Sequence, residues 1–123
     1  MSMIGIGVDV VDIERFRSAL QRTPSMRTRL FTPSELAYVE PQADPVPSLA
    51  ARFAAREAVM KSLGLGLGAF GFHDVWVERA PSGAPSLVFA GQASELAERA
   101  GVSAWHLSLT HSDIVAVAYV IAE

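Results

Sequence analysis

The most constraining feature of this sequence is an alanine-rich stretch near its middle, SLAARFAAREAVMKSLG, from Ser48 to Gly64. Alanine is the strongest helix former, a serine at the start suits an N-cap, and a glycine at the end suits a helix stop. The pattern therefore predicts one helix over Ser48–Gly64. Phe53, Glu57 and Lys61 recur every four residues, so they fall on one face of that helix.

The Glu57–Lys61 pair has an ordinary structural interpretation. A carboxylate one turn before a cation is a common ion pair on a helix surface, worth about 0.2–0.5 kcal/mol. Taken alone, the helix favours that interpretation. The rest of the chain weakens it, and Lys61 is the only lysine in the sequence.

A second charged residue stands in an apolar segment near the start of the chain. Residues 3–11 are apolar apart from Asp9, and isoleucine and valine alternate with glycine, which predicts a strand that ends near Asp9. A buried carboxylate needs a partner because an unpaired buried charge is costly. Asp12 is better placed to cap the following helix. Asp9 is therefore left for a ligand role or a structural salt bridge.

The remaining segments alternate between helix and strand signals. Apolar spacing predicts a helix over 13–22, with Ile13, Phe16 and Leu20 on its core face. A capping box led by proline predicts a short helix over 33–39, and three prolines make 40–47 a loop. The later elements expected are strands over 74–80, 86–90, 105–109 and 114–121, and a helix over 92–100 that Gly101 ends.

These elements indicate the fold class. Strands joined mostly as hairpins, with helices between them, are typical of α+β proteins. The strand over 114–121 is continuously apolar, so we expect it to be central and buried on both faces. A chain of 123 residues suits one domain over 1–123. We therefore expect a mostly antiparallel sheet packed on the long central helix.

Composition argues against several classes of protein. The formal net charge of −3 argues against general nucleic-acid binding, and no apolar run reaches the roughly 18 residues of a membrane span. The absence of cysteine excludes disulfides and thiolate metal sites and fits a reducing compartment. No basic region precedes Asp9, so we expect no signal peptide and a cytoplasmic location.

Two short motifs each leave two interpretations. Residues 66–71 match G-x-G-x-x-G, but a dinucleotide-binding loop follows a strand and opens a helix, whereas this one follows a helix and opens a strand. It is a flexible loop, either a plain linker or a backbone that approaches a ligand closely. His111 stands at a predicted hairpin turn, either as a polar turn residue or, with Ser108 and Thr110, as part of a phosphate pocket.

A basic surface is predicted on the first helix. Five arginines fall within residues 15–29, and no acidic residue intervenes between Glu14 and Glu35. Arg15 and Arg22 are seven residues apart and lie opposite the apolar face of their helix. The arginines form either a solvated basic face or a docking surface for an acidic partner.

Three motifs stand in one order: G-V-D-V-V-D-I-E-R-F from Gly7, R-F-A-A-R-E-A-V-M-K from Arg52, and W-H-L-S-L-T-H from Trp105. Together they resemble the holo-acyl-carrier-protein synthase family of phosphopantetheinyl transferases, in its small single-domain form. The first motif is weak alone, and the second is much more specific. The resemblance covers the chain from Met3 to Glu123 and implies a 4′-phosphopantetheinyl transferase-like fold.

The resemblance implies an activity. The family transfers the 4′-phosphopantetheine arm of coenzyme A to a serine hydroxyl of an apo acyl carrier protein, releases adenosine 3′,5′-bisphosphate and needs Mg²⁺. By resemblance, Asp9 and Glu57 hold the Mg²⁺, and Glu57 and Lys61 are the catalytic residues, with Lys61 reaching the phosphates. A general base is also needed, and both Glu57 and a water on the metal are candidates.

The resemblance also assigns binding residues. Those expected near coenzyme A are Arg52, Arg56, Lys61, Gly64, Ser108 and His111. Ser108 and His111 would lie on its 3′-phosphate side. The first helix would dock the acidic carrier, with Arg15 matching the motif arginine and Arg22 assigned by its helical face. Family members of this size are usually homotrimers with sites between subunits.

Arg56 departs from the family pattern, which usually has lysine there. Arginine keeps the charge but cannot give up a proton at ordinary pH, so the replacement matters only if that lysine transfers a proton. The alternative function is a non-catalytic module that binds acidic carrier proteins and has a degenerate site. A cruder interpretation is an unrelated small α+β binding domain with a structural Glu57–Lys61 pair.

Overall fold

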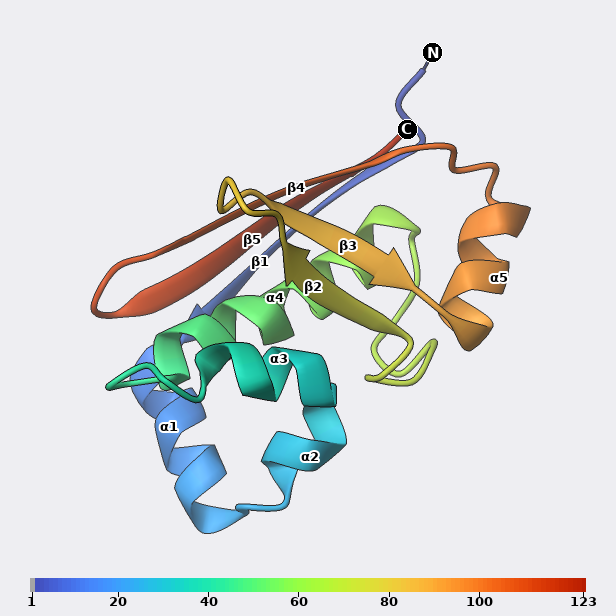
Figure 1. Cartoon of the computed structure of the whole chain (residues 1–123). Coiled ribbons are helices and arrows are strands. Elements are labelled where there is room, and N and C mark those ends of the chain that lie inside the picture. Colours follow the sequence, from blue (N-terminus) through green and yellow to red (C-terminus); the bar gives the residue numbers. More distant parts are fainter. Residues whose placement is uncertain (1) are drawn as a thin grey trace.

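The computed structural model describes residues 2–123, and these form two antiparallel sheets and five helices, of which the longest, α4, is central (Figure 1). The strands are β1 (Gly5–Asp12), β2 (Val75–Arg79), β3 (Pro85–Phe89), β4 (Trp105–His111) and β5 (Val115–Ala122). The helices are α1 (Ile13–Arg22), α2 (Met26–Leu30), α3 (Pro33–Val39), α4 (Val46–Ser62) and α5 (Gly91–Arg99). The predicted α+β class, with antiparallel strands on a central helix, is confirmed.

The three-stranded sheet has the order β1-β5-β4, and α4 lies along one of its faces (Figure 1). The contact between β1 and α4 depends on two glycines. A Cβ atom at Gly5 would lie 1.7 Å from the Ser62 carbonyl oxygen, and one at Gly7 would lie 1.9 Å from the Ala58 carbonyl oxygen. Only glycine lets the two backbones come this close. Because side chains alternate along a strand, Asp9 lies on the same helix-facing side.

The opposite face of this sheet carries exposed apolar side chains. Ile4, Ile6, Val8 and Val10 project from β1 and the residue before it, and are 42–58% exposed. Tyr119, the register partner of Val8 on β5, is 41% exposed. We call this set of five the outer face. The strand β5 is central, as predicted, but the prediction that it is buried on both faces is wrong. Only its helix-facing alanines and Val120 are fully buried.

The central helix begins two residues earlier than expected. It starts at Val46, whose amide donates to an Asp44 carboxylate oxygen (3.2 Å), and Pro47 falls in the first turn, where proline is tolerated. Ser48 is therefore inside the helix, and its hydroxyl donates to the Gln42 side chain. The predicted stop is confirmed, because Gly64 follows the last turn with a φ of +69°.

Two other elements differ locally from the prediction. The short helix α2 interrupts a segment for which no structure was predicted, because five residues show no clear periodicity. The strand β4 extends to His111, so Thr110 and His111 pair with β5 instead of forming the turn.

The two sheets meet where Phe89 stacks on Trp105, with ring centroids 4.5 Å apart. Across residues 2–123, no helix has the length and apolarity needed to cross a bilayer.

Candidate active site

Two carboxylates from different elements meet in one cavity. Asp9 comes from β1 and Glu57 from α4, and both line a cavity of about 720 Å³. The same cavity is bordered by α1 and by the loop that follows α4. Its other lining residues are Val10, Val11, Asp12, Arg15, Phe16, Ser18, Ala19, Arg22, Phe53 and Leu67. These four segments thus bring together the carboxylates of Asp9 and Glu57, that of Asp12, which caps α1, two arginines and an apolar wall.

Lys61 pairs with Asp9. Its ammonium donates to an Asp9 carboxylate oxygen at 3.1 Å and to the Val8 carbonyl oxygen at 3.0 Å. The Lys61 side chain remains 53% exposed, whereas that of Asp9 is 18% exposed. The ion pair on this side of α4 is thus between helix and strand. It does not follow the i, i+4 spacing that the sequence suggested for Glu57 and Lys61.

Glu57 is the more desolvated carboxylate of the two. It is only 7% exposed. Burial raises the pKa of Glu57 above its ordinary value, the negative charge of Asp9 raises it further, and the positive charge of Lys61 opposes both effects. A buried carboxylate beside a second carboxylate is a costly arrangement, and such arrangements cluster at functional sites.

The donor set of this cavity fits a hard divalent cation. Magnesium is typically held by one or two carboxylates, with water and substrate phosphates completing the octahedron. Asp9 and Glu57 supply that number of carboxylates. Residues 2–123 contain no group of three or more His, Cys, Asp or Glu side chains that could hold a metal.

The arginines of α1 differ in their surroundings. Arg15 and Arg22 are exposed on α1, and both line the cavity. Arg17 instead forms ion pairs with Glu14 and with Asp44, at 3.0 and 2.8 Å, and so fastens α1 to the segment before α4. Arg15 and Arg22 therefore lie at the cavity, whereas Arg17 has a structural role.

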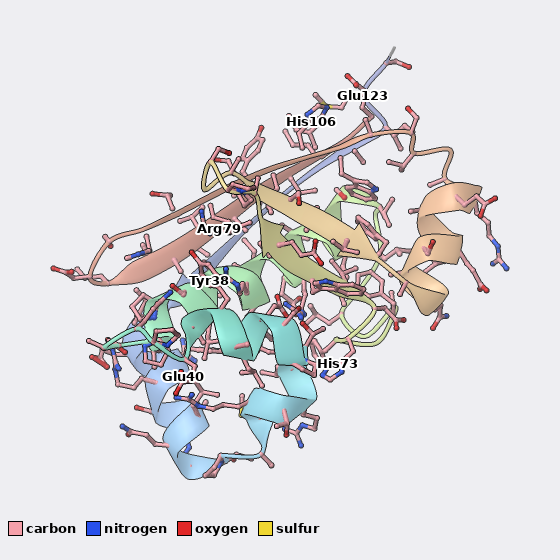
Figure 2. All side chains as sticks on the ribbon, in the orientation of Figure 1. Tyr38, Glu40, His73, Arg79, His106 and Glu123 are labelled. Carbon is pink, nitrogen blue, oxygen red and sulfur yellow. The ribbon has the colours of Figure 1, made fainter. Side chains whose placement is uncertain are left out.

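Arg52 borders a different cavity. It is 1% exposed and lines a space of about 220 Å³ together with Ser34, Tyr38, Val77, Glu78 and Arg79. Figure 2 shows Tyr38 and Arg79 beside each other there. The Arg52 guanidinium lies over the Tyr38 ring, 4.7 Å from its centroid. Burial lowers the pKa of Arg52 from its ordinary value, and its Nε atom is buried without a hydrogen-bond partner.

Arg56 points away from both cavities. It is fully buried, and its guanidinium bonds to Glu35 and to the Phe72 carbonyl oxygen. Arg56 is therefore not among the residues that we propose to contact the substrate. The reason is its helical position, since the residue before Glu57 is turned about 100° away from it. Gly64 is exposed just beyond the last turn of α4, and its amide donates to the Lys61 carbonyl oxygen.

Ser108 and His111 lie on β4, separated from β1 by the intervening strand β5. Ser108 is exposed on the outer face, next to Tyr119 in the strand register. His111 is exposed at the end of β4. Figure 2 shows another exposed histidine, His106, near Glu123, with 3.5 Å between its Nε2 atom and the carboxylate. Neither Ser108 nor His111 lines the cavity that holds Asp9 and Glu57.

Sequence reasoning missed the residues that position this site. Gly5 and Gly7 bring β1 against α4, and a signal for them was available in the G-I-G-V-D pattern, where glycines at every second position precede a carboxylate. Leu67 was also missed. It is 78% exposed at the cavity. No pattern in the sequence distinguishes it from its neighbours in the loop.

Comparison with known proteins gives the family. Residues 5–120 match the family model of the 4′-phosphopantetheinyl transferase superfamily. A holo-[acyl-carrier-protein] synthase from Frankia alni is 48% identical over 123 residues, which cover 100% of this chain and 99% of that protein.

Comparison with solved structures gives the same family. The holo-[acyl-carrier-protein] synthase from Neisseria meningitidis superimposes with a TM-score of 0.90 at 31% identity, covering 99% of both chains. One from Bacillus anthracis, in complex with CoA (3′,5′-ADP), gives 0.82 at 29% identity, covering 98% of this chain and 96% of that one. This chain belongs to the 4′-phosphopantetheinyl transferase superfamily and, within it, to the holo-[acyl-carrier-protein] synthases.

Proposed function

We propose that this enzyme transfers 4′-phosphopantetheine from coenzyme A to a serine of an apo acyl carrier protein in a Mg²⁺-dependent reaction that releases adenosine 3′,5′-bisphosphate. The observation that carries the proposal is the meeting of Asp9 and Glu57 at one cavity that Arg15 and Arg22 also line, with Lys61 paired to Asp9. The coenzyme A complex of the Bacillus anthracis relative supports the choice of substrate. A cytoplasmic location, expected from the sequence, is part of the same proposal.

In this mechanism Asp9 and Glu57 hold the metal, and Lys61 binds the phosphates. When bound, Mg²⁺ would neutralise the charge that develops on the leaving phosphate. The Lys61 ammonium sits on a flexible side chain that is half exposed, so it can act as a mobile point charge toward the same phosphates. The apolar wall of Phe16 and Phe53 leaves room beside the carboxylates for a neutral part of the substrate.

The nucleophile comes from the carrier. Its serine oxygen forms a bond to the phosphorus of the phosphopantetheine phosphate while the bond to the adenosine bisphosphate breaks, and the serine proton passes to an acceptor. Burial raises the pKa of Glu57, which suits a general base, because such a base works best when its pKa approaches the working pH; a water on the metal is the alternative acceptor. The absence of a serine–histidine pair in the cavity lining is consistent with a nucleophile that the partner supplies.

The remaining expected coenzyme A contacts lie apart from this cavity. Arg52 offers a buried, unpartnered N–H beside a small cavity, which suits a phosphate oxygen. Ser108 and His111 are exposed on β4. A site that uses all of these residues requires two subunits, one supplying Asp9, Glu57, Lys61 and Gly64, the other supplying Arg52, Ser108 and His111.

The outer face supports such an assembly. Its exposed apolar side chains on β1 and β5 form a surface that monomeric proteins rarely leave uncovered. We assign it to contacts between copies of this chain in a homotrimer, with the number of subunits taken from the family resemblance.

The carrier docks on α1 in this proposal. Arg15 and Arg22 stand at the rim of the cavity that would receive the carrier serine. Carrier proteins of this family are acidic, and arginine pairs well with carboxylates and phosphates. Charge complementarity then steers the carrier serine toward Glu57.

The proposal is tested by replacing Glu57. The Glu57→Gln variant keeps the shape of the side chain and removes the charge that holds the metal. We expect its rate of adenosine 3′,5′-bisphosphate release, measured with coenzyme A, Mg²⁺ and apo carrier, to fall by about 100-fold or more. Glu95→Gln, an exposed change on α5, should leave the rate unchanged. Full activity in Glu57→Gln would refute the metal assignment. A wild-type protein that binds carrier without turnover would instead support the non-catalytic module.

A further inference from the structure

Arg56 occupies an unusual position, because it is a fully buried cation that directly precedes Glu57 in α4. Its guanidinium uses every nitrogen. Nη1 and Nη2 donate to the two carboxylate oxygens of Glu35, Nη1 also donates to the Arg52 carbonyl oxygen at 3.2 Å, and Nε donates to the Phe72 carbonyl oxygen at 2.7 Å. A planar fork with fixed donors suits this arrangement, and a single ammonium does not.

Glu35 makes the other half of the pair rigid. It is 1% exposed, and besides Arg56 its carboxylate accepts from the Thr32 amide at 3.0 Å and from the Val77 amide at 3.1 Å. These bonds tie the start of α3 and strand β2 to α4. A buried ion pair whose two partners are both hydrogen-bonded to the surrounding backbone holds its neighbours in one geometry. The Arg56 guanidinium that donates to the Phe72 carbonyl oxygen is therefore itself held in place.

Phe72 connects the Arg56–Glu35 pair to the cavity. The glycine loop, which we define as residues 63–74, begins beside Lys61 and ends at β2. The Phe72 ring near the end of this loop stacks on Phe53, with centroids 6.1 Å apart, and Phe53 lines the cavity that holds Glu57. Leu67, from the same loop, lines that cavity as well.

Other bonds hold the end of the glycine loop but do not reach α4. His73 bonds through Nε2 to the Thr28 carbonyl oxygen, and the Gly71 amide donates to the Asp74 carboxylate. Among the hydrogen bonds described for residues 2–123, the bond from Arg56 to Phe72 is thus the one that joins a side chain of α4 to this loop. The first residues of the loop are held to α4 by backbone bonds instead, such as the bond from the Leu65 amide to the Met60 carbonyl oxygen at 2.9 Å.

We propose that Arg56 is a positioning residue, which acts through Phe72 to hold the glycine loop and Phe53 in place as one wall of the substrate cavity. The inference rests on the proposed function, because the wall matters for the substrate that enters there. It also explains why arginine serves at this position. Arg56 uses the Nη atoms for the pair with Glu35 and the Nε atom for the loop.

The Arg56→Lys variant separates these two tasks. Lysine keeps a positive charge opposite Glu35, so the buried carboxylate still has a partner, but one ammonium cannot also reach the Phe72 carbonyl. Arg17→Lys is the matched control, because it weakens an ion pair between α1 and Asp44 that touches neither the glycine loop nor the cavity. Phe72→Leu is the second variant. It keeps the carbonyl and the buried pair and removes the ring that stacks on Phe53.

Steady-state kinetics with coenzyme A and apo carrier supply the first measurement. We expect Arg56→Lys and Phe72→Leu each to raise the KM for coenzyme A by about 5–10-fold while kcat stays within about 2-fold, because uniform binding is lost and the reacting groups are kept. Arg17→Lys should leave this KM unchanged. A KM for coenzyme A that stays at the wild-type value in both Arg56→Lys and Phe72→Leu would overturn the proposal, and so would a loss confined to kcat.

Hydrogen exchange of the glycine loop supplies the second measurement, and it does not depend on activity. The amides of Ala69, Gly71 and Asp74 bond within this loop. They should exchange about 10-fold faster in Arg56→Lys than in Arg17→Lys. Equal exchange in the two variants would contradict the proposal. Failure of the wild type to turn over coenzyme A would refute the proposed function alone, and the exchange rates would still decide whether Arg56 holds the loop.

Discussion

At the scale of single residues, the site is built at the expense of local stability. Glu57 is buried beside Asp9, and both burial and the neighbouring charge raise its pKa. A carboxyl whose pKa is higher in the folded than in the unfolded protein binds more protons when folded. Stability therefore falls as pH rises from the ordinary value of about 4.3 through the raised value of the folded protein. At neutral pH the ionised Glu57 is a destabilising group.

The Glu57→Gln variant should therefore be more stable than the wild type at neutral pH. In thermal melts without divalent metal, we expect its Tm at pH 7 to exceed that of the wild type by a few degrees Celsius. The difference should shrink as the pH falls to 4 and below, where Glu57 becomes protonated in both the folded and the unfolded state. Glu95→Gln on α5 is the control. A Tm advantage that is absent at pH 7, or equally large at pH 4, would contradict the account of Glu57.

At the scale of elements, the central relation is the packing of β1 on α4. The backbone of β1 lies so close to the helix that the positions of Gly5 and Gly7 admit no side chain. This contact sets how far Asp9 stands from Glu57 and Lys61. The same helix turns Arg56 toward α3 and β2, so a single element supplies both the Glu57 carboxylate of the cavity and the arginine of the buried ion pair.

The Gly7→Ala change tests the β1–α4 contact. Its Cβ would meet the Ala58 carbonyl oxygen at 1.9 Å, so strand and helix must separate. We expect a loss of about 2–3 kcal/mol in the free energy of unfolding, measured by urea denaturation. Gly66→Ala is the control, because no atom lies within 4 Å of its added methyl group. Equal stability of the Gly7→Ala and wild-type proteins would show that β1 does not pack as described.

At the scale of the whole molecule, the sequence predicted much of the fold and part of the site. The periodicity of α1, the capping box of α3 and the stop at Gly64 are local signals, and all three were correct. The start of α4 was misplaced, because the N-cap residue is Pro45 and the Asp44 carboxylate accepts from the first helical amide, that of Val46. The burial of Arg56 depends on Glu35, 21 residues away in the chain, and no local pattern contains that information.

The outer face of the sheet carries a prediction about assembly. Val8→Glu places a charge in the middle of the exposed apolar side chains of β1 and should not disturb the face that packs on α4. We expect sedimentation to give a trimer for the wild type and monomers for Val8→Glu, together with a loss of transfer activity. Gln92→Glu, an exposed change on α5, should stay trimeric. A trimeric and active Val8→Glu would place the subunit contact elsewhere.

The most direct test of the account is the intact mass of an apo acyl carrier protein after incubation with this protein, coenzyme A and Mg²⁺. We predict that the carrier gains the mass of one phosphopantetheine group, and that a chelator or the Glu57→Gln change prevents the gain. A carrier mass that stays unchanged across several carriers, with the protein folded, would contradict the proposed transfer reaction. A gain that persists in the presence of chelator would contradict the role assigned to Asp9 and Glu57.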